Sequence, residues 1–147
     1  MSDPQVELRV ASDPRILSAV RGAVRGFADA NGVDRDTADR VVLAVDEACA
    51  NTIRHAYAGR ADRRFTLTLR ASDRYLEFEV KDGGKPCPES ARRKHRPKAP
   101  ASIDDVRVGG LGIPLLYEVF DKVEWFAGAS RGNRVVMKLR HAQAKKG

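Results

Sequence analysis

The stretch that most constrains the fold is residues 41–57, which read VVLAVDEACANTIRHAY and have the apolar spacing of one long amphipathic helix. One face collects Ala38, Val41, Val42, Val45, Ala48, Cys49, Thr52, Ile53 and Ala56. The opposite face carries Glu47, Asn51, Arg54 and His55. Because Glu47 and Asn51 lie four residues apart, a carboxylate and a carboxamide project side by side from successive turns. On periodicity alone, a solvated helix surface remains the favoured interpretation of these polar residues.

Apolar alternation elsewhere predicts short strands. The predicted strands cover residues 5–11, 65–69, 76–80, 123–126 and 134–139. Residues 71–74 join the second and third of these strands into a hairpin, and residues 128–133 form the turn between the last two.

Helix signals complete the pattern. Ser12 or Asp13, followed by Pro14, predicts the start of a helix that ends at Asn31 and Gly32. Asp34 or Asp36 is expected to cap the long helix, which runs to about Ala58, and a short apolar helix covers residues 113–120. Antiparallel hairpins with helices gathered on one side predict a two-layer α+β sandwich.

A chain of 147 residues is long enough for one domain with its own core, and we expect residues 1–147 to form one domain. Residues 83–109 show no periodicity and contain four prolines, which predicts a lid over a cavity, a disordered stretch or both. Residues 141–147 are expected to fray.

The net charge of +7 raises the question of nucleic-acid binding. Within residues 83–100, six basic residues face one acidic residue, so much of the surplus lies in one proline-rich segment. No aromatic residue interleaves this segment as a base-stacking surface requires, and we rank nucleic-acid binding last.

No apolar run approaches the roughly 20 residues of a membrane span, and the N-terminus lacks a signal pattern. We therefore expect a cytoplasmic protein without membrane contact. The two cysteines, Cys49 and Cys87, show no metal-ligand spacing and are expected to be free thiols.

Two glycine motifs follow the long helix. Asp82, Gly83 and Gly84 end a predicted strand, and GGLG at residues 109–112 opens the short helix. A glycine run entering a helix exposes N–H groups that suit phosphate. An aspartate beside closely approaching backbone suits an adenine amino group, and a carboxylate beside a carboxamide suits Mg²⁺. Each motif alone is more often a simple turn; their co-occurrence favours a nucleotide site.

EACANTIRHAY at residues 47–57, DGG at 82–84, GGLG at 109–112 and DKVE at 121–124 together resemble the bacterial anti-sigma-factor serine kinases. The similarity extends from about Val6 to Leu139. These proteins belong to the gyrase, Hsp90, histidine kinase and MutL (GHKL) superfamily. The resemblance implies the Bergerat fold: a two-layer sandwich with a mixed, mostly antiparallel sheet, helices on one face and an ATP lid.

The resemblance also implies roles for individual residues. Glu47 would be the catalytic base, and Asn51 would coordinate the Mg²⁺ that bridges the ATP phosphates. Asp82 would accept a hydrogen bond from the adenine amino group, and Gly84 would let the backbone close on the purine. The remaining site residues are expected to contact phosphates or line the pocket: Arg54, His55, Arg107, Gly110, Leu111 and Gly112.

Three positions depart from the family pattern. Pro86 replaces a frequent glycine, Asn133 stands where a threonine is common beside the adenine, and Pro114 lies in the first turn of the short helix. None of the three removes a group to which the resemblance gives a catalytic role.

The leading hypothesis is an ATP-dependent protein-serine/threonine kinase that sequesters a sigma factor and phosphorylates its STAS-type antagonist, with a homodimer favoured. The alternative is a nucleotide-binding switch that regulates a phosphatase or sigma factor by binding alone. The catalytic domain of a histidine kinase ranks lower, because no phospho-acceptor helix pair precedes the motifs.

Overall fold

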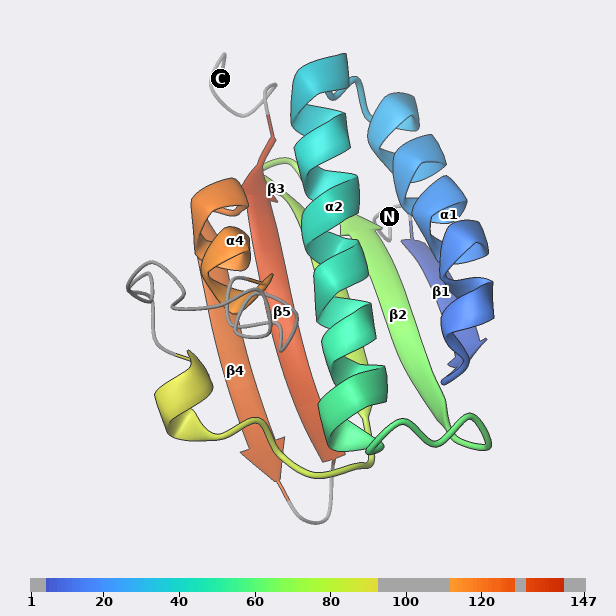
Figure 1. Cartoon of the computed structure of the whole chain (residues 1–147). Coiled ribbons are helices and arrows are strands. Elements are labelled where there is room, and N and C mark those ends of the chain that lie inside the picture. The colour runs from blue at the N-terminus through green and yellow to red at the C-terminus, as the bar shows by residue number, and fades with distance from the viewer. Residues whose placement is uncertain (1–4, 93–111, 129–131, 142–147) are drawn as a thin grey trace, which may run out of the picture.

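The computed structural model describes residues 5–92, 112–128 and 132–141. The strands are β1 (Gln5–Ala11), β2 (Arg64–Ala71), β3 (Tyr75–Asp82), β4 (Lys122–Gly128) and β5 (Gly132–Arg140). The helices are α1 (Leu17–Ala30), α2 (Arg35–Asn51) and α4 (Gly112–Val119) (Figure 1). Two 3₁₀ turns, Pro14–Ile16 and Glu89–Arg92, and one π turn, Thr52–Ala56, complete the elements.

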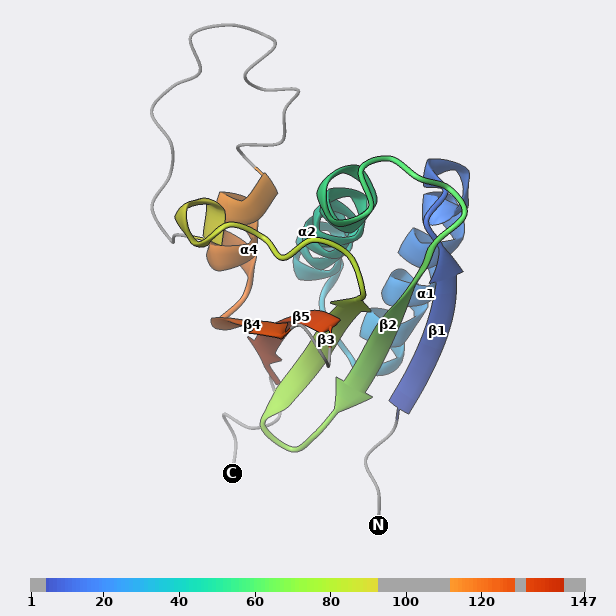
Figure 2. The same ribbon diagram turned by 90° about the horizontal axis from the view of Figure 1, so that it is seen from below.

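The strands form one sheet in the order β1-β2-β3-β5-β4, and the helices lie over one of its faces (Figure 2). The predicted two-layer α+β sandwich is therefore confirmed. All four pairings of the described strands are antiparallel, where a mixed, mostly antiparallel sheet was expected. The last strand, β5, lies between β3 and β4.

The core fills the space between the helices and the sheet. The Phe78 ring from β3 meets Phe27 of α1 at 5.9 Å and Phe120, just beyond α4, at 5.7 Å between centroids. Burial of each such side chain contributes roughly 1.5–3 kcal/mol. The predicted apolar face of the long helix is confirmed by its buried members: Ala38, Val41, Val42, Val45, Ala48, Cys49, Thr52 and Ile53.

The opposite face of the sheet carries charged side chains joined by ion pairs. Glu79 is only 8% exposed, and its carboxylate lies 3.0 Å from Arg134 Nη1 and 4.0 Å from Arg70 Nη2. Arg70 Nη1 also lies 2.6 Å from Glu77 Oε2. Thr68 is also buried on this face.

The helix ends show how local sequence positions α2. Of the two proposed caps, Asp34 is the one that accepts a hydrogen bond, from Thr37 N at 3.0 Å. The prediction of one α-helix to Ala58 is wrong at its C-terminal end. Regular α-helix stops at Asn51, and the π turn that follows has its own bond from Tyr57 N to Thr52 O of 3.0 Å. Such turns often occur at functional sites.

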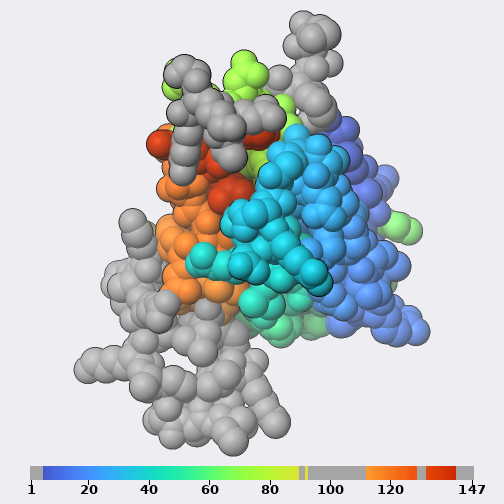
Figure 3. Space-filling model, turned by 90° about the horizontal axis from the view of Figure 1, so that it is seen from above, coloured from blue at the N-terminus to red at the C-terminus, as the bar shows by residue number. Residues whose placement is uncertain are grey.

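From above, α1 and α2 form one side of the molecule, and α4 with β4 forms the other (Figure 3). Within the described residues, no helix is long and apolar enough to cross a membrane. Of the predicted lid, residues 83–92 are described and include the 3₁₀ turn Glu89–Arg92, where no regular element was expected. Residues 93–109 and 142–147 lie outside the described residues.

Candidate functional site

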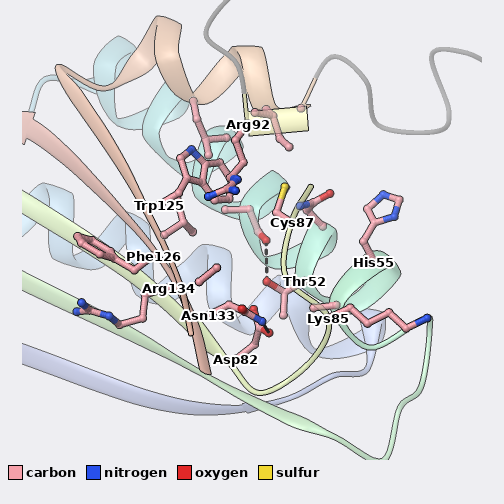
Figure 4. Close-up of a pocket in the computed structure, with 18 of the residues that line it drawn as sticks. Thr52, His55, Asp82, Lys85, Cys87, Arg92, Trp125, Phe126, Asn133 and Arg134 are labelled. Atoms are coloured by element: carbon pink, nitrogen blue, oxygen red, sulfur yellow. Dashed lines mark hydrogen bonds between the residues drawn. The ribbon is translucent and has the colours of Figure 1, made fainter. Parts of the chain in front are cut away.

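A pocket opens between α2, α4, the adjoining ends of β3, β5 and β4, and the segment that follows β3 (Figure 4). The empty space within it is about 660 Å³, including open solvent at its mouth. The three predicted motifs meet here, because Glu47, Asn51, Asp82 and Gly112 all line this pocket.

The α2 wall of the pocket carries Glu47 and Asn51 on successive turns, as predicted. The side chain of Glu47 is 31% exposed, and its Oε2 lies 3.7 Å from Arg54 Nη2. Arg54 is exposed and is not among the residues that line the pocket, so its contact with the site is through Glu47. His55 does line the pocket, from an exposed position on the π turn.

The end of the helix holds the loop that follows β3. Tyr57 Oη accepts a hydrogen bond from Gly83 N at 2.9 Å and donates one to Arg64 O at 2.5 Å. Lys85 N donates to Ala56 O at 2.9 Å. The motif residues at 55–57 and 82–84, which are separate in the sequence, therefore form one hydrogen-bonded unit.

Gly84 has a structural reason to be glycine. A Cβ at this position would lie 2.1 Å from Ala56 O, a distance that no side chain tolerates. Gly84 packs against the helix end and is not among the residues that line the pocket. The expected approach of Gly84 to a purine thus remains a prediction, whereas its contact with Ala56 is observed.

Asp82 lies at the β3 end of the pocket. Its Oδ1 accepts hydrogen bonds of 2.9 Å from Gly84 N and from Asn133 Nδ2. Burial raises the pKa of the Asp82 carboxyl, and the two hydrogen bonds oppose that rise. Asn133 also donates to Gly84 O at 2.8 Å, so one carboxamide fixes both the acid and the glycine loop.

Asn133 was noted in the sequence only as a departure from the family pattern. Its placement depends on Gly132, which has φ of +75° and where a Cβ would lie 2.5 Å from Asp82 O. Glycine at 132 permits this close approach of β5 to β3. The sequence signal was a glycine immediately before an amide on a strand.

Gly112, the first residue of α4, places the GGLG motif next to Glu47 of the long helix. A Cβ on Gly112 would lie 2.6 Å from Glu47 Oε2, so the start of α4 adjoins the proposed base. The other predicted residues of this region, Arg107, Gly110 and Leu111, lie outside the described residues.

Several pocket residues were not predicted. Trp125 on β4 and Arg92 at the end of the 3₁₀ turn lie at one end of the pocket, with Asp82 and Asn133 at the other (Figure 4). Tyr117 joins the first pair: its Oη accepts from Trp125 Nε1 at 2.9 Å and donates to Arg92 O at 2.6 Å. Neither Arg92 nor Trp125 belongs to a recognisable local motif.

Both cysteines of the chain are free, as predicted. Cys87 lines the pocket, and burial raises the pKa of its thiol. Cys49 is fully buried in α2, which raises its thiol pKa much further. Among the described residues, no three histidine, cysteine, aspartate or glutamate side chains gather into a metal site.

The chain is similar to a known family over most of its length. A model of the histidine kinase-like ATPase domain matches residues 10–139. The serine-protein kinase RsbW of Halalkalibacterium halodurans is 32% identical over 121 residues, which cover 81% of this chain and 74% of that protein. The RsbW of Bacillus subtilis is 27% identical over 120 residues, which cover 80% of this chain and 75% of that protein.

A solved structure has the same fold. The crystal structure of the RsbU and RsbW domains of a Mycobacterium tuberculosis protein aligns with a TM-score of 0.67 at 16% identity. The alignment covers 93% of this chain and 32% of that one, so this chain spans about a third of the length of that crystallised chain.

Proposed function

This chain belongs to the histidine kinase-like ATPase family and, within it, to the RsbW group, and we propose that it is an ATP-dependent protein-serine/threonine kinase. The observation that carries the proposal is the meeting of Glu47, Asn51 and Gly112 at one wall of a pocket whose far end holds Asp82.

The residues present fit magnesium and ATP. Asp82 Oδ2 receives no hydrogen bond from the described residues and is available to an adenine amino group. The Asn51 carboxamide offers an oxygen to Mg²⁺, an ion that commonly takes one or two protein ligands and fills its shell with phosphate and water. The first turn of α4 presents N–H groups to phosphate. Bound ATP would supply the phosphoryl group, and Mg²⁺ would neutralise part of the negative charge of the phosphates.

Glu47 is the residue that we assign as general base. Its carboxylate is partly exposed, so the hydroxyl of a protein substrate can reach it. It would accept the proton of a serine or threonine hydroxyl as that oxygen attacks phosphorus. Arg54, 3.7 Å away, positions the carboxylate and balances its charge before the substrate arrives.

The family suggests which partners to propose. We propose that the protein sequesters a sigma factor, that its substrate is a STAS-type antagonist of that sequestration, and that it acts as a homodimer in the cytoplasm. Phosphorylation of the antagonist would then keep the sigma factor bound.

The proposal is tested by incubating the protein with labelled ATP and a STAS-type antagonist protein. We expect label on the antagonist, and Glu47→Gln should lower the transfer rate by roughly 10²–10⁴ while ATP binding survives. Glu7→Gln, on the exposed edge strand β1, is the matched control and should transfer at the wild-type rate. Binding of ATP and antagonist without transfer of label would favour the alternative of a non-catalytic switch.

A further inference from the structure

Arg92 is a cation in the pocket whose role is not explained by the protein's own contacts. It ends the 3₁₀ turn Glu89–Arg92, and its side chain lines the pocket (Figure 4). The Nε of Arg92 is shielded from water and has no hydrogen-bond partner. Buried donors in native proteins nearly always have a partner, and one that lacks it requires an explanation.

The backbone of Arg92 is held in place. Tyr117 Oη donates a 2.6 Å hydrogen bond to Arg92 O and accepts one of 2.9 Å from Trp125 Nε1. One phenol thus fixes the 3₁₀ turn to both α4 and β4. The backbone position from which the Arg92 side chain projects is therefore set by the packed fold.

Glu47, Asp82 and Arg134, which also line the pocket, already have partners, whereas Lys85 is exposed and forms no ion pair among the described residues. Glu47 lies against Arg54, and Asp82 receives two hydrogen bonds. Arg134 adjoins the pocket, but its guanidinium binds Glu79 on the opposite face of the sheet. Within the described part of the chain, Arg92 has no carboxylate within ion-pair distance.

We propose that Arg92 binds a phosphate group of the nucleotide. A planar guanidinium matches phosphate oxygens in pairs, and the Arg92 side chain lines the pocket in which the phosphates would lie. This inference rests on the proposed function, because it takes ATP as the ligand. It adds a phosphate contact from the segment after β3 to those expected at the start of α4, so that the Arg92 guanidinium and backbone N–H groups hold the phosphates from two sides.

The phosphate contact predicts a selective loss of affinity. Arg92→Gln should weaken binding of Mg·ATP and Mg·ADP by roughly 10- to 100-fold, the range expected for hydrogen bonds to charged groups. Adenosine, which has no phosphate, should bind as tightly as it does to the wild type. Arg92→Lys keeps the positive charge but loses the paired donors, so its affinity for Mg·ATP should lie between those of the wild type and Arg92→Gln.

A second variant tests the positioning by Tyr117. Tyr117→Phe removes the bond to Arg92 O and leaves the guanidinium, and we expect a several-fold loss for Mg·ATP with none for adenosine. Arg74→Gln, in the exposed turn between β2 and β3, is the matched arginine control.

Titration calorimetry measures the affinities, and thermal unfolding checks that each variant is folded. Trp125, the chain's single tryptophan, gives an independent fluorescence signal from inside the pocket. Equal losses for adenosine and ATP, or an unchanged ATP affinity in Arg92→Gln, would overturn the phosphate contact while leaving the kinase proposal intact. A wild-type protein that binds no nucleotide would overturn both.

Discussion

Asn133 and Asp82 are joined by a 2.9 Å hydrogen bond that falls on one particular oxygen, Oδ1, which also accepts the bond from Gly84 N. Both bonds that the carboxylate receives from the described residues thus converge on the same atom. The other oxygen, Oδ2, remains available to a ligand. The pair therefore fixes the orientation of the acid without using its second acceptor.

Replacing Asp82 with asparagine should lower ATP affinity without lowering the stability of the fold. Asn keeps an Oδ1 for Gly84 N and Asn133, but it presents an NH₂ group where an adenine amino group needs an acceptor. We expect ATP affinity to fall roughly 10- to 100-fold, with the free energy of unfolding at neutral pH unchanged or slightly higher.

The pH dependence of Asp82→Asn follows from the direction of the pKa shift. Because burial raises the pKa of Asp82, the folded state holds this proton more tightly than the unfolded state. Its contribution to stability is present below the unfolded pKa and is lost as pH rises through the folded pKa. Urea unfolding across that window should show a flatter pH profile for Asp82→Asn than for the wild type. An identical profile would contradict the shift; Asp73→Asn, in the exposed β2–β3 turn, is the control.

Gly112→Ala should disturb Glu47 specifically. The added Cβ would lie 2.6 Å from Glu47 Oε2, so the carboxylate must move. A displacement of about 1 Å can lower catalysis roughly 10²-fold. In a Glu47→Ala background, where that oxygen is absent, the same change should cost little more. The phosphoryl-transfer rates of the wild type, the two single variants and the double variant give the coupling free energy between Gly112 and Glu47. Strictly additive losses in activation free energy would show that Gly112 acts elsewhere.

Tyr57→Phe should loosen the loop after β3. The change removes the bond from Gly83 N and the bond to Arg64 O, each worth about 1 kcal/mol. We expect the free energy of unfolding to fall by roughly 1–2 kcal/mol and nucleotide affinity to fall with it. Tyr75→Phe, whose ring lies near two lysines on the open sheet face, is the control and should change neither quantity appreciably.

The two thiols should differ in reactivity. Cys87 lines the pocket and Cys49 is fully buried, so N-ethylmaleimide should label only Cys87 in the native protein and both thiols in urea. Because burial raises the pKa of Cys87, labelling should accelerate as pH rises above neutrality. Mg·ATP should slow the reaction, and Cys87→Ser should abolish native labelling. Equal labelling rates with and without Mg·ATP would place the nucleotide away from Cys87.

The sequence predicted the strands and the buried face of α2, because each of these elements repeats its apolar residues at a short, regular spacing. The β1 prediction, residues 5–11, coincides with the observed strand, and the other predicted strands are extended by one to two residues at their ends. Glu47 and Asn51 reach one pocket because they belong to the α-helical part of the long helix, where four residues make about one turn.

Features that depend on distant contacts were not predictable. Residues 52–56 make about one turn, which is too short for apolar spacing to distinguish an α-helix from a π turn. What distinguishes them is the surroundings of that turn, where Lys85 N bonds to Ala56 O and Gly84 packs beneath it. Asn133 reaches Asp82 across 51 residues of sequence, and no local pattern records such a pairing.

The place of β5 between β3 and β4 sets an order on the assembly of the pocket. Among the described strands, β4 is hydrogen-bonded only to β5, so Trp125 has no sheet to lie on until β5 has paired with β3. A chain still being synthesised can form the β1-β2-β3 sheet and its helices first. The complete pocket, which includes Trp125 and Asn133, forms only after β5 has emerged, so a nucleotide bound there would stabilise the finished fold and not its precursors.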